Sequence, residues 1–420
     1  MSAGKTILVY ADWQGLGGAV RVGTLGVEVL RGKEVYSFEY DKTWLKHPDN
    51  LAIDPALELF EGRHFVTHKR RNFGVFLDSS PDRWGQRLMD RRASLHAELE
   101  PEKSNVLHDS DYLLGVHDLS RMGGLRFKLS DEGPFLDNSI VGAAPPMARL
   151  RELEQASHDF EATGYDDALQ LDNLAVLLAP GSSLGGARPK ASVVDHDRSL
   201  WIAKFPSNAD EVDTGSWEYL SMQLAKDCGI SIPNVRRERF VSRNHTLLSQ
   251  RFDRTAGGDR IHMVSAMTML QREDGDEQPS SYLDIVDVIE RTSDGVACEL
   301  EQLWRRVLFN VLISNTDDHL RNHAFLWDGA SWRLSPAYDL NPNPKRRYLS
   351  LNIDESSSDA DIALVMKSAP YYRIDSKTAT AILTQMSDIV RTWESRAKLL
   401  GISRSECTLM KPAFEGHTRF

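Results

Sequence analysis

The sequence contains few cysteines, and their arrangement excludes two classes of protein. Its 420 residues include only Cys228, Cys298 and Cys407, which are far apart and odd in number. This spacing predicts neither a disulfide framework nor a zinc site, and the histidines show no metal-binding spacing. The pattern is typical of the reducing cytoplasm.

Long apolar runs and an excess of positive charge are also missing. No stretch approaches the roughly 20 apolar residues of a membrane helix, and residues 1–5 lead straight into a strand-like run without a secretory core. Lys and Arg total 50 against 61 Asp and Glu, which makes the net charge −11. We therefore expect a cytoplasmic protein with no membrane partner, and any role at DNA only through a partner that binds the DNA.

The length and the local patterns predict several packed units. Residues 1–135 begin with alternating strands and turn glycines, and a proline-containing stretch without periodicity follows. Residues 147–254 combine a helix with two hairpins, the second over residues 238–252. Residues 255–420 are mainly helical in pattern.

A loop rich in glycine and serine covers residues 181–190 and opens the first hairpin, which ends on Lys204. A helix is predicted next, capped by Asp213, Thr214 or Ser216, reaching about residue 227 and stopped by Gly229. Further on, apolar residues at three- and four-residue spacing predict an amphipathic helix over residues 300–312. Asp-Gly at 328–329 then predicts a hairpin that returns the chain to residues 338–339.

These segments contain, in order, the groups that phosphoryl transfer requires. Backbone amides of residues 181–186 could hold phosphates, and Lys204 could supply a cation for them. Asp317 could be the base, because Asn322 follows five positions later, as in the protein-kinase catalytic loop. Asn322 and Asp339 offer the oxygen ligands that Mg²⁺ prefers.

Each part also has a simpler interpretation. A Gly-rich loop is usually a turn, and a strand lysine such as Lys204 is usually solvated. The Asp317 segment could cap a helix, and Asp339 could lie at a loop corner. His319 could shuttle protons, contact phosphate or hold the loop, while Glu218 could pair with Lys204 or only favour its helix dipole. The order of the parts favours phosphoryl transfer. Neither a Walker A motif nor a nucleophile elbow is present.

At this point the residues resemble the HipA family of toxin–antitoxin kinases. The first third resembles the family at residues 76–82 and 111–114. The main matching stretches are residues 183–190, 201–206, 250–254, 315–322 and 336–339.

The resemblance implies an α+β, two-lobed protein-kinase-like fold. It has a β-rich N-lobe over residues 147–254, a mainly α-helical C-lobe over 255–420, and an extra β-rich subdomain over 1–135. It further implies an ATP- and Mg²⁺-dependent serine/threonine protein kinase toxin that causes growth arrest or persistence. Its target could be an aminoacyl-tRNA synthetase. The implied partner is a HipB-like helix-turn-helix antitoxin, through which alone the chain would reach operator DNA.

The resemblance also assigns residues. Asp317, His319 and Lys204 are the expected catalytic residues, and Asn322 and Asp339 the metal ligands. Autophosphorylation is expected at Ser183, with Ser182 adjacent. The expected nucleotide-binding residues are Ser183, Gly185, Gly186, Ala187, Lys190, Lys204, Gln250, Phe252, His319 and Tyr338.

Two alternatives remain open. The Asp-x-His-x-x-Asn pattern at residues 317–322 is also similar to phosphatidylinositol kinases, so the substrate could be a lipid or another small molecule. The chain could also be a catalytically inert, ATP-binding co-repressor that acts by interaction alone. The acidic balance disfavours the first, and the presence of Lys204, Asp317, Asn322 and Asp339 together disfavours the second.

Overall fold

The computed structural model describes residues 4–67, 70–99, 106–139, 144–162, 177, 186, 188–276 and 278–415. The chain forms two compact units, each built from more than one stretch of sequence. Unit 1 comprises residues 1–208, 253–264 and 271–273, and unit 2 comprises residues 209–252, 265–270 and 274–420. The finer division predicted from the sequence, at 1–135, 147–254 and 255–420, remains a prediction.

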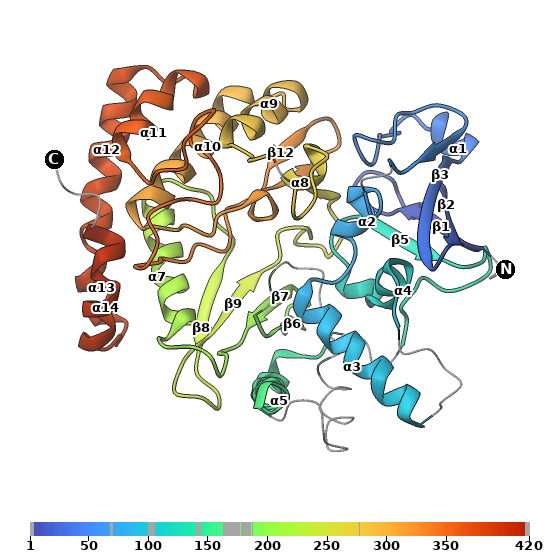
Figure 1. Cartoon of the computed structure of the whole chain (residues 1–420), viewed down its shortest axis with the longest axis horizontal. Coiled ribbons are helices and arrows are strands. Elements are labelled where there is room, and N and C mark those ends of the chain that lie inside the picture. Colours follow the sequence, from blue (N-terminus) through green and yellow to red (C-terminus); the bar gives the residue numbers. More distant parts are fainter. Residues whose placement is uncertain are drawn as a thin grey trace. The chain divides into compact units, whose positions relative to one another are not determined.

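Unit 1 begins with an antiparallel five-stranded sheet (Figure 1) in the order β4-β3-β2-β1-β5. Tyr36, Phe38 and Tyr40 are buried on one face of β3, as expected for one of the alternating strands predicted at the start of residues 1–135. The strands are β1 (Lys5–Ala11), β2 (Val20–Leu30), β3 (Lys33–Tyr40), β4 (Arg63–Phe65) and β5 (Leu125–Lys128).

The rest of unit 1 is mainly helical and ends in the predicted first hairpin. Strands β6 (Lys190–Val194) and β7 (Leu200–Lys204) pair so that Lys190 lies opposite Lys204. The helices are α1 (Lys42–Leu45), α2 (Gly74–Asp78), α3 (Arg83–Leu99), α4 (Asp109–Gly115), η1 (Asp118–Ser120), η3 (Met147–Arg149) and α5 (Leu150–Ala162).

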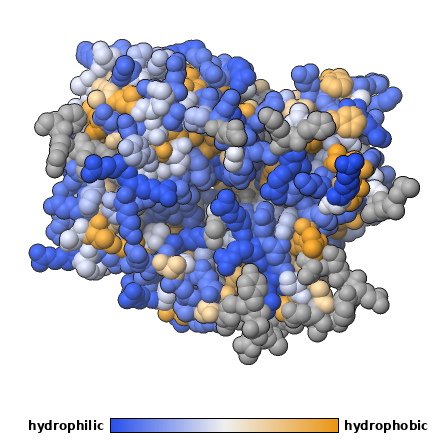
Figure 2. Space-filling view, in the orientation of Figure 1, coloured by the Kyte–Doolittle hydropathy of each residue, from blue (hydrophilic) through white to orange (hydrophobic). Residues whose placement is uncertain are grey.

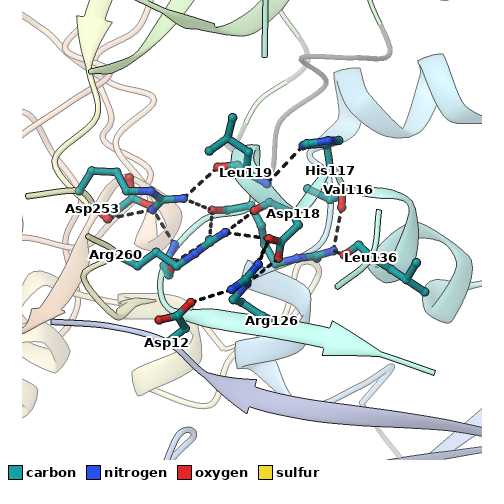
Figure 3. A network of polar contacts seen from close by, with 12 residues as sticks. Asp12, Val116, His117, Asp118, Leu119, Arg126, Leu136, Asp253 and Arg260 are labelled. Carbon is teal, nitrogen blue, oxygen red and sulfur yellow. Dashed lines mark hydrogen bonds and ion pairs between the residues drawn. The ribbon is translucent and has the colours of Figure 1, made fainter. Parts of the chain in front are cut away.

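A network of arginines and aspartates joins residues 253–264 to the rest of unit 1 (Figure 3). Arg260 forms an ion pair with Asp118 at 3.4 Å, and Arg126 joins Asp118 to Asp12. Asp253 accepts a hydrogen bond from the amide of Gly123 at 2.8 Å. Buried charges are tolerated where opposite charges and hydrogen bonds surround them, so this network fixes the segment that directly follows residues 250–252.

Unit 2 is built around α10 (Val296–Leu312), the amphipathic helix predicted from apolar spacing. In Figure 1, helices α11–α14 lie together beside α7 and α10. Its strands are β8 (Val235–Glu238), β9 (Thr246–Gln250), β11 (Ala324–Trp327) and β12 (Trp332–Leu334), while β10 (Met263–Ser265) spans the passage from unit 1. The helices are α7 (Thr214–Asp227), α8 (Ala266–Met269), α9 (Tyr282–Thr292), α10, η4 (Leu320–Asn322), α11 (Ile362–Ser368), η5 (Ala369–Tyr372), α12 (Ser376–Val390), α13 (Trp393–Leu399) and α14 (Arg404–Glu415).

Local sequence signals account for several boundaries in unit 2. The side chain of Asp213 accepts a hydrogen bond from the amide of Ser216 and caps α7. Gly229 adopts a positive φ of 77° just after the helix, as expected for a glycine stop. The Asp328–Gly329 turn joins β11 to β12. The second hairpin is found at β8 and β9, slightly before the predicted residues 238–252.

The drawn face of the molecule (Figure 2) is mostly polar. On the face drawn in Figure 2, hydrophilic residues predominate and apolar ones form small separate groups. Within the described ranges, no helix combines the length and the apolar character that crossing a bilayer requires.

Candidate active site

The loop between α10 and β11 contains three of the residues predicted to carry the chemistry. Residues 313–318 are buried with one exception, Asp317, which is exposed. His319 is half-buried, and Asn322 is buried at the end of η4. The loop begins at Ser314 with a positive φ of 52°, an uncommon conformation for a residue other than glycine.

Asp317 and Asp318 are adjacent carboxylates in opposite environments. Asp318 is 3% exposed, and its Oδ2 accepts hydrogen bonds from the Tyr282 hydroxyl and the Asn310 amide, both at 2.7 Å. His323 Nε2 lies 2.9 Å from the same oxygen. Because α9, α10 and both sides of η4 meet at one carboxylate, Asp318 anchors the loop and leaves Asp317 facing outward.

The charge of Asp318 is stabilised by this arrangement. Burial by itself raises the pKa of the Asp318 carboxyl, but His323 and the Tyr282 hydroxyl outweigh burial, so the net shift of its pKa is downward. A carboxylate that stays ionised in this position keeps all three contacts.

The sequence analysis did not identify Asp318, Tyr282, Asn310 or His323 as parts of the site. One signal was present. Asn310 is a polar residue next to the apolar stripe of α10, and such a residue often marks a buried hydrogen-bond network. Its Oδ1 also accepts a hydrogen bond from Asn315 at 3.0 Å.

Oxygen donors suited to a hard cation lie at the predicted metal residues. The Asn322 side chain donates through its nitrogen to the Asp317 carbonyl at 3.4 Å, which leaves the amide oxygen, the atom that a cation binds, outside this contact. Asp339 has a positive φ of 60°, and one of its carboxylate oxygens accepts a hydrogen bond from Asn341 at 3.0 Å.

An orphaned atom supports a cation at this place. Asn341 Oδ1 is buried and has no hydrogen-bond partner in the described part of the chain. Within the described part of the chain, no three His, Cys, Asp or Glu side chains form a group suited to a metal. A donor set of few carboxylates and amides fits Mg²⁺, which binds proteins through one or two carboxylates and completes its shell with water and phosphate oxygens.

Two predicted nucleotide-binding residues pack together. The rings of Phe252 and Tyr338 are 5.5 Å apart, and the Tyr338 hydroxyl donates to the Arg321 carbonyl at 2.6 Å. Tyr338 therefore ties the segment of Asp339 to the chain between α10 and β11. Gln250 ends β9, and its side-chain oxygen accepts a hydrogen bond from Asn234 at 2.7 Å.

Asp317 lines a cavity of about 420 Å³ within unit 2. The other lining residues are Glu211, Val212, Asn341, Pro342, Asn343, Pro344, Lys345, Arg346, Leu409 and Met410. The cavity gives the exposed carboxylate access to a ligand of the size of a short peptide segment.

The remaining predicted site residues belong to unit 1 or lie outside the described residues. Lys204 ends β7 in unit 1. Lys190 is 3% exposed and forms an ion pair of 2.9 Å with Asp82. Gly186 has a positive φ of 89° and accepts a hydrogen bond from the amide of Trp84.

Ser183, Gly185 and Ala187 lie outside the described residues, so their roles stay predictions. Glu218 is buried on α7 in unit 2, and its pairing with Lys204 of unit 1 also stays a prediction.

The buried anchor leads to a first prediction. Asp318→Asn should reduce the free energy of unfolding by about 1–3 kcal/mol, because the buried donors lose a charged acceptor. Asp317→Asn is the matched control, since an exposed neighbour should change stability by no more than about 0.5 kcal/mol. Urea unfolding of both variants measures this difference. Equal stabilities would show that Asp318 does not anchor the loop.

Comparisons with known proteins show the fold and the family of this chain. The family model described as "HipA-like C-terminal domain" matches residues 182–393. The HipA chain in the complex of Shewanella oneidensis HipA, HipB and operator DNA has the same fold, with a TM-score of 0.66 at 16% identity, covering 99% of this chain and 98% of that chain. The predicted α+β, kinase-like HipA fold is therefore confirmed.

Two curated relatives carry names that mention kinases. "Putative kinase Y4mE" of Sinorhizobium fredii is 26% identical over 337 residues, 72% of this chain and 71% of the relative. "Putative kinase" of Haemophilus influenzae is 25% identical over 188 residues, which cover 39% of this chain and only 54% of the relative. The matched family domain spans half of the sequence and contains all residues between α10 and β11, and the chain belongs to the HipA family.

Proposed function

We propose that this chain is an ATP- and Mg²⁺-dependent serine/threonine protein kinase that acts as the toxin of a toxin–antitoxin pair in the cytoplasm. The observation that carries the proposal is the contrast within the catalytic loop. Asp317 is exposed to a cavity while Asp318, next to it, is buried and anchors the loop. A general base must reach the proton that it removes, and a rigid support keeps it in place.

The proposed reaction assigns a task to each residue. Asp317 accepts the proton of the acceptor hydroxyl, whose oxygen forms a bond to the γ-phosphorus as the bond to the bridging oxygen breaks and ADP leaves. Asn322 and Asp339 would hold Mg²⁺, with Asn341 beside them; when bound, the cation supplies positive charge that offsets the charge of the phosphates. Lys204 binds phosphate oxygens, and His319 contacts phosphate or holds the loop.

The proposed nucleotide site also includes the Gly-rich loop and the segment after β9. The phosphates would be surrounded by Lys190 and by the backbone of Ser183, Gly185, Gly186 and Ala187. The adenine ring of ATP would lie near Gln250, Phe252 and Tyr338. The packing of Phe252 against Tyr338 supports a shared role for this pair.

The proposed partner is a HipB-like helix-turn-helix antitoxin, because the structurally similar Shewanella protein is described in a complex with HipB and operator DNA. The net charge of −11 supports indirect contact with DNA. An aminoacyl-tRNA synthetase is the proposed target, whose modification would cause growth arrest or persistence.

Intact-mass spectrometry of the purified chain with Mg-ATP tests the proposal. The wild type should gain one phosphate, mapped to Ser183, in the Gly-rich loop. Ser183→Ala should abolish the gain, whereas the matched control Ser182→Ala should retain it. A chelator should also prevent it. If the wild type binds ATP but modifies neither itself nor any protein, the kinase proposal is wrong.

A further inference from the structure

The cavity at Asp317 is where a phosphate acceptor has to enter, if the proposed function holds. A base takes a proton only from a hydroxyl within hydrogen-bond reach. One wall of this cavity consists of residues 341–346, which begin two positions after the predicted metal ligand Asp339. We call residues 341–347 the acceptor-side segment. The side chains of this segment that line the cavity therefore face the polypeptide that carries the acceptor hydroxyl.

The acceptor-side segment is held firmly beside the catalytic loop. The amide of Asn343 donates to the Ser314 carbonyl, and the hydroxyl of Ser350, just beyond the segment, donates to the Thr316 carbonyl, both at 3.0 Å. Pro342 and Pro344 restrict the backbone between these points. These two bonds attach the chain around the segment to the three residues before Asp317, so the segment stays close to the base.

This segment ends in three consecutive exposed cations, Lys345, Arg346 and Arg347. Lys345 pairs with Glu211 at 2.9 Å, but both side chains are about two-thirds exposed, so the pair is weak. Arg346 and Arg347 form no ion pair with any residue in the described ranges. Consecutive unpaired arginines are notable in a chain whose net charge is −11.

We propose that Arg346 and Arg347 select protein substrates in which acidic residues flank the phosphorylated serine or threonine. Arginine presents a planar fork that binds carboxylates with two hydrogen bonds. A cavity of about 420 Å³ is roughly 7–8 Å across, which an extended chain crosses in two or three residues. We therefore expect the acidic residues of the substrate within about three positions of its phosphorylated serine or threonine.

Arg346 and Arg347 should also disfavour substrates in which basic residues flank the acceptor. A peptide with Lys or Arg near the acceptor would bring like charges against Arg346 and Arg347, and specificity in such sites often depends on repulsion as much as on attraction. Because the guanidinium groups are exposed, raising the salt concentration should weaken the preference.

Steady-state kinetics with three synthetic peptides test this proposal. Each peptide has one serine, flanked by glutamates, by glutamines or by lysines. The wild type should use the glutamate peptide with a kcat/KM about tenfold above that of the glutamine peptide. The double variant Arg346→Glu with Arg347→Glu should invert the order, through KM, and favour the lysine peptide. A purely structural defect would lower all three values and could not invert them.

The matched control is Arg243→Glu with Arg291→Glu, which changes the net charge equally at exposed positions on other elements of unit 2. It should keep the wild-type order of peptides. Equal use of the three peptides by the wild type, an unchanged order in the variant, or autophosphorylation without transfer to any peptide would overturn the proposal and leave the kinase function standing. Phosphorylation of phosphatidylinositol vesicles in place of the peptides would also overturn it. A wild type that transfers phosphate to nothing, itself included, would instead contradict the proposed function.

Discussion

Replacing Asp317 by asparagine is expected to slow phosphoryl transfer by about 100-fold or more, with little change in the affinity for ATP. Asparagine has nearly the same shape as aspartate but cannot accept a proton. Asp317 also lies at the exposed point of a loop that is anchored elsewhere, so the fold should survive the change. Single-turnover transfer of labelled γ-phosphate, with calorimetric titration of an ATP analogue, separates the two quantities.

Asp287→Asn is the control for this experiment. Asp287 is exposed on α9 in the same unit and is not among the residues that line the cavity of Asp317. It should transfer phosphate at the wild-type rate. Near-normal turnover in Asp317→Asn would assign the base to another residue and remove the main support for the proposed mechanism.

The second large effect concerns stability in unit 1. Asp82→Ala should reduce the free energy of unfolding by about 3–5 kcal/mol, because it removes the carboxylate that faces the buried ammonium of Lys190. The two side chains are 2% and 3% exposed and lie 2.9 Å apart. Burial raises the pKa of Asp82, while Lys190 and the amide of Gly85 oppose that shift. These partners therefore stabilise the ionised form of the Asp82 carboxyl.

Denaturant unfolding measures this loss, and hydrogen exchange of residues 83–95 and 190–204 locates it. Replacing both partners, as in Asp82→Leu with Lys190→Met, should restore most of the stability, since two apolar side chains leave no buried charge. Glu152→Ala, which breaks the exposed pair with Arg149, should change stability by less than about 1 kcal/mol. A similarly small loss in Asp82→Ala would show that the pair is not essential.

The Asp82–Lys190 pair also bears on the predicted nucleotide site. Lys190 is the last residue of the Gly-rich loop, and Gly186 accepts a hydrogen bond from the amide of Trp84 at the start of α3. The exit of that loop is therefore attached to the first part of the chain. The ion pair with Asp82 gives Lys190 a structural role, whereas its role in phosphate binding stays a prediction.

Much of the fold follows from local signals. Asp213 and Gly229 define the ends of α7, apolar spacing predicts the core helix α10, and the Asp328–Gly329 turn makes the last hairpin. These features depend on capping, periodicity and turn chemistry within a few residues, which are visible in the sequence. The order of Asp317, Asn322 and Asp339 was visible for the same reason, and it led to the HipA family.

The sequence by itself determined the family, the main helices and hairpins, and the residue types available for phosphoryl transfer. Only the tertiary structure decided that Asp317 is exposed while Asp318 is buried, that Lys190 meets Asp82, and that Arg346 lines the same cavity as Asp317. Local propensity cannot distinguish two adjacent aspartates. Their difference arises from Tyr282 and Asn310 on two helices, which approach one carboxylate only when the apolar faces of those helices pack.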